Sequence, residues 1–265
     1  MPSIEILGSG NASQVPQWGC DCAACCRAKL NSYYKRRPCS LCITTDLGVT
    51  MIDAGRTDLA EHYDFADVKR FVLTHFHMDH VQGLFHLRWA NSAQKIPVYR
   101  PNDVTGTDDL YKHSGCLDFQ SPWQAFKKYN LGDMQITALP LIHSKPTFGY
   151  FIELANTRIA YLTDTVGLPA ATEFFLQQQS IDYCFLDCSD PPRESSRLKP
   201  ELAPSKTPKR NHNDFTLALT IIAAIKPKQT ILTHISHQFD CWLMQHSDKL
   251  PKNFSVAVDH QKITI

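Results

Sequence analysis

The segment Thr74–His80, which reads Thr-His-Phe-His-Met-Asp-His, constrains this chain more than any other stretch. It places the side chains of His75, His77, Asp79 and His80 within six residues, and imidazole and carboxylate are common ligands of hydrolytic first-row metals such as Zn and Mn. The cluster follows a short apolar strand and precedes a helix. Because residues two apart in extended backbone point the same way, His75 and His77 can face one metal position. Asp79 and His80, at the start of the helix, can face a second metal position. The motif therefore favours a site for two metals over a surface loop that is merely rich in histidine.

Three further candidate ligands, His143, Asp164 and His234, each come just after a predicted strand. The strands are predicted at 134–139, 157–162 and 230–233. Taken singly, each of these residues is an ordinary polar side chain. Because ligands at strand ends converge on one edge of a sheet in an α/β sandwich, we expect all three to meet the early cluster there.

The chain contains ten cysteines, and four of them lie close together in the sequence. Cys20, Cys22 and Cys25 form a Cys-x-Cys-x-x-Cys knuckle, which lacks only a fourth ligand for a closed tetrahedral zinc site. Such a zinc would be structural, since four protein ligands leave no position for water. The alternative is a loop of free cysteines, and the adjacent Cys26 could compete with Cys25. Disulfides are not expected, because we recognise no secretion signal.

The composition is that of a globular α/β protein, with 265 residues and 43% hydrophobic side chains. We expect one domain over 1–265, with the cysteine knuckle near 20–25 and an extended, Pro-rich basic loop near 190–210. The net charge of +1 excludes the basic excess of a general nucleic-acid binder but leaves small anionic substrates open. No apolar run approaches the ~18 residues of a membrane span, and residues 1–7 carry no signal-peptide pattern, so we expect a cytoplasmic protein without a membrane partner.

Several motifs together resemble a known family. The pattern His75-x-His77-x-Asp79-His80 resembles the signature of the metallo-β-lactamase superfamily, and other stretches resemble one group within it, the PhnP-type phosphodiesterases of the carbon–phosphorus lyase pathway. Those stretches are Trp18-Gly19-Cys20-x-Cys22-x-x-Cys25, Arg37-Pro38-Cys39-Ser40, the run from Leu73 to Phe85, His143-Ser144-Lys145-x-Thr147-Phe148-Gly149-Tyr150, Asp187-Cys188-Ser189, Arg210-Asn211-His212 and the run from Leu232 to Asp240. They span nearly the whole chain, and the knuckle and the two late His segments are narrower signals than the metal motif.

The resemblance implies a four-layer αββα sandwich of two mixed sheets flanked by helices. It assigns metal one to His75, His77 and His143, metal two to Asp79, His80 and His234, and the bridge between the metals to Asp164. It also implies that His237 completes the knuckle zinc, that Asp53 hydrogen-bonds a ligand histidine, and that His212 acts as general acid or stabilises charge on the phosphoryl oxygens. Cys26 departs from the family pattern.

The activity implied by the resemblance is metal-dependent hydrolysis of a cyclic phosphodiester. A hydroxide between the metals would open 5-phospho-α-D-ribosyl 1,2-cyclic phosphate to ribose 1,5-bisphosphate during phosphonate catabolism, with His212, Asp79 and Asp164 as the catalytic residues. The family favours Mn, while the nitrogen and oxygen ligands also suit Zn or Fe, and one structural Zn is expected in addition. The resemblance also implies a homodimer acting on a small phosphorylated sugar, without a nucleic-acid partner.

Other functions stay open at this point. Within the same superfamily, the rivals are processing of the tRNA 3′ end and hydrolysis of a lactone or thioester. From a different class, the chain could be a non-catalytic zinc protein whose knuckle recruits a partner. Lys145, Arg36 and Arg37 are candidates for binding the distal phosphate of a phosphorylated substrate.

Overall fold

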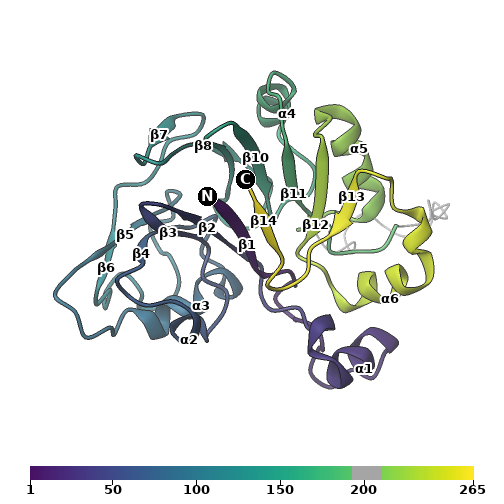
Figure 1. Ribbon diagram of the computed structural model, residues 1–265, viewed down its shortest axis with the longest axis horizontal. Coiled ribbons are helices and arrows are strands. Elements are labelled where there is room, and N and C mark those ends of the chain that lie inside the picture. The colour runs from purple at the N-terminus through teal and green to yellow at the C-terminus, as the bar shows by residue number, and fades with distance from the viewer. Residues whose placement is uncertain (193–210) are drawn as a thin grey trace, which may run out of the picture.

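Two β-sheets packed face to face form the centre of the molecule (Figure 1). The computed structural model describes residues 1–192 and 211–265, and within these ranges each sheet has seven strands. Helices cover the outer faces, so the layers run helix, sheet, sheet, helix. This arrangement confirms the αββα sandwich expected from the sequence. Most of the loop predicted near 190–210 lies outside the described residues.

The first sheet comes almost entirely from the N-terminal half of the chain. In spatial order its strands are β14 (Lys262–Thr264), β1 (Ser3–Gly8), β2 (Ser40–Thr45), β3 (Gly48–Ile52), β4 (Val68–Val72), β5 (Ile96–Tyr99) and β6 (Leu117–Phe119). Strands β14 to β3 pair antiparallel, and β3 to β6 pair parallel. Because β3 and β4 run in the same direction, the residues that follow them emerge at the same edge of the sheet. Those residues are Asp53 and the histidine motif.

The second sheet supplies the remaining strand ends that position the site. In spatial order it contains β13 (Phe254–Val256), β12 (Gln229–Thr233), β11 (Tyr183–Asp187), β10 (Thr157–Leu162), β9 (Phe148–Leu154), β8 (Met134–Pro140) and β7 (Lys128–Asn130). Strands β7 to β10 form antiparallel pairs, whereas β10 to β13 are parallel. Strands β8, β10, β11 and β12 consequently point the same way. The segments that follow them carry His143, Asp164, Ser189 and His234 to one edge.

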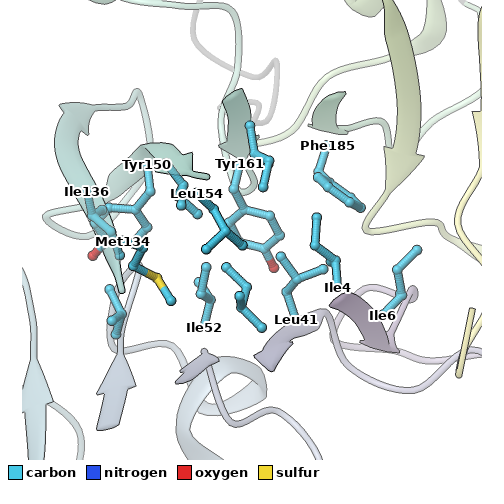
Figure 2. Close-up of a cluster of buried hydrophobic side chains, with 14 of the residues drawn as sticks. Ile4, Ile6, Leu41, Ile52, Met134, Ile136, Tyr150, Leu154, Tyr161 and Phe185 are labelled. Carbon is cyan, nitrogen blue, oxygen red and sulfur yellow. The ribbon is translucent and has the colours of Figure 1, made fainter. Parts of the chain in front are cut away.

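Apolar side chains from both sheets fill the space between them (Figure 2). Alternating residues such as Ile4 and Ile6 on β1 face Tyr161 and Phe185 on the opposite sheet. Full burial of a large apolar side chain stabilises a fold by about 1.5–3 kcal/mol, so this layer is a main source of stability. Tyr150 on β9 also donates a hydrogen bond from its hydroxyl to the carbonyl of Leu73, just before the histidine motif. The core thereby fixes the backbone that leads into the motif.

Helices pack on the outer face of each sheet (Figure 1). The first sheet is covered by α2 (Leu59–His62) and α3 (Met78–Leu87), and the second by α4 (Ala170–Gln177), α5 (Phe215–Ile225) and α6 (His237–His246). A further helix, α1 (Ala23–Leu30), packs against α6 at the rim of the sandwich. Short 3₁₀ turns occupy Ser32–Tyr34 and Ser247–Lys249. No helix in the described part of the chain is both long and apolar enough to cross a membrane.

The structure differs from the sequence expectations mainly in short elements. The sequence predicts a short helix over 57–63, but only Leu59–His62 are helical. It also predicts that the helix after the histidine motif continues through Ala90, whereas that helix ends at Leu87. Strands β6, β7, β13 and β14 have three residues each, which is too few for a periodic pattern to reveal.

Candidate metal centre

The seven side chains predicted as metal ligands come together at one end of the sandwich. They are His75, His77, Asp79, His80, His143, Asp164 and His234, and they form two groups that share Asp164. Asp164 and His234, just past the ends of β10 and β12, adopt left-handed backbone with φ of 59°. This conformation is uncommon for residues other than glycine and often marks functional sites. The sheet edge therefore brings together residues that are up to 159 positions apart.

The first group contains three imidazoles and one carboxylate oxygen. His77 Nδ1 lies 2.9 Å from His75 Nε2 and 3.0 Å from His143 Nε2. Asp164 Oδ2 lies 3.6 Å from His75 Nε2 and 3.5 Å from His143 Nε2. Donor atoms bound tetrahedrally at about 2.0–2.1 Å from one cation are roughly 3.3–3.4 Å apart, so this spacing fits a first-row metal.

The second group, on Asp79, His80, Asp164 and His234, directs its donor atoms toward a different candidate metal position. His80 Nε2 and His234 Nε2 lie 3.2 and 3.4 Å from Asp164 Oδ1, and 3.4 and 3.6 Å from Asp79 Oδ2. Three of these atoms, on His80, Asp164 and His234, are buried and make no hydrogen bond. Leaving buried polar atoms without partners is costly, whereas a cation held between them would satisfy all three.

The carboxylate of Asp164 connects the two groups. Its Oδ2 faces the first group and its Oδ1 faces the second, so a single side chain can contribute one oxygen to each. The side chain is almost wholly buried, at 2% exposure, which fixes this orientation. Geometry of this kind suits two cations held side by side rather than one.

The pKa values show that this location favours positive charge. Burial by itself would lower the pKa of His80, but Asp164, Asp79 and Asp53 together raise it well above its usual value. Burial would raise the pKa of Asp164, yet the surrounding histidines hold it well below its usual range. In contrast, burial and the neighbouring His143 lower the pKa of His77 to about 4. Ionised carboxylates and a neutral imidazole are the protonation states that bind metals.

Contacts behind the donor atoms orient three of the imidazoles. His80 Nδ1 lies 2.7 Å from Asp53 Oδ2, which is the supporting contact expected of Asp53. Asp53 is itself held by the backbone amide and the hydroxyl of Thr74, each at 2.7 Å. His234 Nδ1 lies 2.8 Å from Ser189 Oγ, and a further contact at 3.1 Å joins His143 Nδ1 to a backbone carbonyl at position 211. Each imidazole therefore directs Nε2 toward the donor group.

His212 lies at the mouth of the site and is held by Asp187. Its Nδ1 is 2.8 Å from Asp187 Oδ2, and its ring stacks on His234 with centroids 4.5 Å apart. Burial would lower the pKa of His212, but Asp187, with Asp164 and Asp79, raises it to about 9. His212 is recognisable from the sequence motifs, whereas Asp187 was not predicted as a site residue. The available signal was the position of Asp187 at the end of a strand, inside one of the stretches that resembles the family.

An open cavity of about 300 Å³ gives access to the donor groups. Besides the ligands and His212, its wall contains Asn11, Ala12, Met78 and Asn211. A larger cavity of about 380 Å³ lies beside α2 and α3, but it is lined mainly by apolar side chains and by none of the seven predicted ligands. The chemistry of the donor set therefore identifies the smaller cavity as the candidate active site.

The cysteine knuckle forms a second, separate donor group. Cys20 Sγ and Cys22 Sγ lie 3.4 and 3.3 Å from His237 Nδ1, and Cys25 completes the set. The amide of Gln17 donates to Cys25 Sγ at 3.3 Å, while burial raises the pKa of that thiol to about 12. A cation would favour the thiolate that this burial disfavours.

Cys26 takes no part in this group. Its thiol is exposed and contacts the carbonyl of Asp21 at 3.3 Å instead. The competition with Cys25 that the sequence left open is therefore absent from this arrangement. The four remaining donors can surround a zinc fully, without a position for water.

Comparison with known proteins places the chain in a family. Residues 51–235 match the model of the β-lactamase superfamily domain. In solved structures, a diphosphatase from the PhnP family has a TM-score of 0.80 at 24% identity, covering 99% of this chain and 96% of that one. Zn²⁺-bound PqqB from Methylobacterium extorquens has a TM-score of 0.75 at 18% identity, covering 99% and 100%. Identities this low establish the fold alone.

One curated relative also matches. It is an octanoyltransferase of Porphyromonas gingivalis (strain ATCC BAA-308 / W83), which is 26% identical over 267 residues. The match covers 96% of this chain but only 50% of the relative, so the chain spans about half the length of that protein. The fold, the donor groups at the sheet edge and the match over residues 51–235 together show that the chain belongs to the metallo-β-lactamase superfamily, as a member that resembles PhnP.

Proposed function

We propose that the protein is a metal-dependent phosphodiesterase that opens a cyclic phosphate. The proposed substrate is 5-phospho-α-D-ribosyl 1,2-cyclic phosphate, and the product is ribose 1,5-bisphosphate, a reaction of phosphonate catabolism. The observation that carries this proposal is the pair of donor groups joined by Asp164, with the histidine held by Asp187 beside them. A paired metal centre with a nearby proton donor fits hydrolysis of an anionic ester.

The residues proposed to hold metal one are His75, His77 and His143, those proposed for metal two are Asp79, His80 and His234, and Asp164 contributes one oxygen to each. When bound, two divalent cations supply Lewis acidity and lower the pKa of water from ~15.7 toward neutrality. Asp79 and Asp164 bring only two negative charges to the site, so it retains the positive charge that suits a phosphodiester. The donors are nitrogen and oxygen only, which fits Mn, Zn or Fe, and the proposed metal is Mn.

His212 is proposed to deliver the proton that the leaving alkoxide needs. Asp187 binds Nδ1 of His212, which leaves Nε2 to hold a proton toward the cavity. The raised pKa of His212, about 9, means that the isolated protein carries this proton at neutral pH. Proton transfer to a leaving oxygen in the transition state contributes about 10²–10⁴-fold to rate in general acid catalysis.

The other proposals from the sequence concern the setting of this reaction. The knuckle of Cys20, Cys22, Cys25 and His237 is proposed to bind one structural zinc. We also propose that the protein is a cytoplasmic homodimer that acts on a small phosphorylated sugar. Neither nucleic acid nor a membrane is proposed as a partner. Size-exclusion chromatography coupled to light scattering measures the oligomeric state directly, and a monomer would contradict this part.

A substrate panel tests the proposed function against its rivals. Manganese-loaded protein is assayed with bis(p-nitrophenyl) phosphate, ribosyl 1,2-cyclic phosphates, a 2′,3′-cyclic nucleotide, an N-acyl lactone, an acyl thioester and a precursor tRNA. We expect the ribosyl cyclic phosphates to give the highest kcat/KM. Faster turnover of the lactone or thioester than of any diester would reject the assignment, and so would preferential cleavage of the precursor tRNA. Complete inactivity on the panel would favour the non-catalytic alternative, which the intact donor set argues against.

A further inference from the structure

Among the residues that the structure describes, the wall of the catalytic cavity contains a cationic side chain only if a histidine is protonated. Its described lining residues include neither lysine nor arginine. For a second phosphate on the substrate, beyond the ester cleaved at the metals, the described part of the chain therefore offers a lysine or arginine only outside this wall. Phosphate groups in proteins are most strongly bound by charge-assisted hydrogen bonds, often from arginine.

Two of the three basic residues considered from the sequence are already engaged. Arg36 is buried, and its guanidinium lies 3.0 Å from Asp240 Oδ1 and donates to the carbonyl of Ala257 at 2.6 Å. Lys145 Nζ lies 3.2 Å from Asp103 Oδ2 and donates to the carbonyl of Gly106 at 2.9 Å. Breaking either arrangement would leave a buried or half-buried charge without its partner, which is costly. Neither side chain is available for a ligand.

Arg37 is different, because its guanidinium is exposed and uses only one partner in the described part of the chain. That partner is the amide oxygen of Gln14, at 3.2 Å, and no described carboxylate forms an ion pair with it. Its backbone, in contrast, is fixed: the amide donates to Asp259 Oδ2 at 2.7 Å, and the carbonyl accepts from the amide of Gly10 at 2.8 Å. A guanidinium has five N–H donors, so most of them remain for a ligand.

The position of Arg37 relative to the metal ligands follows from the backbone pairing. Gly10 forms bridges to Pro38 on one side and to Ile235, next to His234, on the other. With about 5 Å between paired strands, Pro38 is roughly 10 Å from Ile235. A Cβ added at Gly10 would meet the carbonyl oxygen of Arg36 at 2.8 Å, so the segments at Gly10 and Arg36 are closely packed. Arg37, next to Pro38, and His234, next to Ile235, therefore lie on segments that flank the same residue.

A separate cavity of about 240 Å³ has Arg37, Gln14 and Gln82 in its lining. Its wall also contains Arg56 and Asp58, which form an ion pair with each other. Gln14 follows Asn11, which lines the catalytic cavity, and its amide donates to the Asn11 carbonyl at 2.9 Å. Gln82 lies one helical turn after Asp79 on α3. The two cavities are therefore neighbours along both the 11–14 turn and the first turn of this helix.

We propose that Arg37 binds a phosphate monoester on the substrate, in the cavity beside Gln14 and Gln82, while the cyclic diester of the same molecule lies at the metal centre. This inference rests on the proposed function, because it assigns the distal phosphate of that substrate. It assigns to Arg37 a role in selecting phosphorylated sugars rather than in the chemistry of cleavage. The guanidinium contacts substrate but not the reacting atoms.

The test compares two substrates and two exposed arginines in the full-length, metal-loaded protein. The substrates are α-D-ribosyl 1,2-cyclic phosphate and its 5-phosphate. The variants are Arg37→Ala, Arg37→Lys and the control Arg158→Ala, whose exposed side chain lies on β10 near the end opposite to Asp164. Calorimetric binding of ribose 5-phosphate gives a readout that does not depend on hydrolysis.

We expect Arg37→Ala to lower kcat/KM for the 5-phosphorylated substrate, and to weaken ribose 5-phosphate binding, by about tenfold or more. In Arg37→Ala, kcat/KM for the unphosphorylated substrate should change by less than about twofold. In Arg158→Ala, kcat/KM and ribose 5-phosphate affinity should both change by less than about twofold. For Arg37→Lys, both values should lie between those of the native protein and Arg37→Ala. Lysine keeps the positive charge but lacks the paired N–H donors of the guanidinium.

Equal losses on both substrates, or unchanged ribose 5-phosphate affinity in Arg37→Ala, would overturn the proposal. Failure of the native protein to bind ribose 5-phosphate would also overturn it. If neither diester is hydrolysed, the proposed function fails on its own, and the binding measurement still decides whether Arg37 recognises a sugar phosphate.

Discussion

Asp164 is the residue on which most of the proposed chemistry depends, because its two oxygens face different donor groups. The carboxylate is buried, and its Oδ1 has no hydrogen bond of its own. A buried, ionised carboxylate in this position is stabilised only if positive charge is held against it. Binding of both metals is therefore expected to depend on this one side chain.

Replacing Asp164 by alanine is expected to remove hydrolysis and metal together. Activity on bis(p-nitrophenyl) phosphate should fall by about 10³-fold or more, since the loss affects the whole centre. Metal content is measured by plasma mass spectrometry on the same sample. Asp118→Ala, a change at an exposed aspartate on β6, serves as the matched control and should keep both activity and metal. An unchanged rate in Asp164→Ala would refute the bridging role.

His212 is expected to matter most when the leaving group is a poor one. In His212→Asn, hydrolysis of an alkyl diester such as a ribosyl cyclic phosphate should fall by about 10²–10⁴-fold, because the alkoxide then departs without a proton. A p-nitrophenolate leaving group departs without a proton, so the rate of bis(p-nitrophenyl) phosphate hydrolysis should fall by less than about tenfold. Rate constants for the two ester types are compared at one pH. Equal losses would assign His212 to charge stabilisation or structure instead of proton transfer.

At this scale the sequence could predict residues whose chemistry shows in their spacing. His75 and His77 stand out because four ligand-type side chains crowd into six residues. Asp187 does not stand out, because its role depends on contacts with His212 and Ser189 that only the folded chain creates. For the same reason, the local sequence could not separate the buried Arg36 from the exposed Arg37.

Among the elements, α2 is directly preceded by an ion pair between Arg56 and Asp58. Asp58, the residue before the helix, accepts hydrogen bonds from Arg56 Nε at 2.7 Å and Nη2 at 2.5 Å. The hydrogen bond from Arg56, partly opposed by burial, lowers the pKa of Asp58 from 3.8 to about 2. Because the pKa is lower in the folded state, the carboxylate stabilises the fold above pH ~4 and loses this contribution as the pH falls toward 2.

Asp58→Asn should therefore destabilise the protein by about 1 kcal/mol at pH 7, a value reduced from the full linkage because the side chain is partly exposed. The difference from the native protein should shrink below pH 4. Urea unfolding followed by circular dichroism between pH 7 and pH 3, with chelator present so that metal binding does not vary, measures both. A difference that is constant over this range would show that the ion pair does not explain the effect.

The donor group of the cysteine knuckle and His237 lies at the contact between α1 and α6. Cys20 and Cys22 lie just before α1 in the chain, and His237 is the first residue of α6. The imidazole of His237 contacts both thiols. With few apolar side chains of its own in the core, α1 depends on this junction. We expect a structural zinc here to tie the two helices.

His237→Ala should lose this zinc and lower the melting temperature by several degrees, while bis(p-nitrophenyl) phosphate hydrolysis falls by less than about tenfold. Cys26→Ala is the matched control, because the exposed thiol contacts the Asp21 carbonyl and is not among the four zinc donors, and it should keep the zinc. The measurements are zinc content and thermal unfolding. Zinc retained by His237→Ala, or lost by Cys26→Ala, would contradict this assignment.

Across the whole molecule, two mixed sheets bring together ligands that are distant in the sequence. The strands β8, β10 and β12 were predictable from alternating or continuous apolar residues, and so was the convergence at one edge of the ligands that follow them. The three-residue strands were not, because their positions depend on pairing with neighbours. The contact of α1 with α6 was accessible only through the family resemblance, which pairs the knuckle with His237, because spacing alone does not link side chains more than 200 residues apart.

Stepwise reconstitution of the catalytic centre tests the paired metal site most directly. Protein is stripped of its catalytic metals while the knuckle zinc is retained, and Mn²⁺ is then added in known amounts as bis(p-nitrophenyl) phosphate hydrolysis is followed. The account predicts negligible activity at the start and a rise that stops at about two equivalents per chain. Full activity in the stripped protein, or saturation at one equivalent, would contradict it.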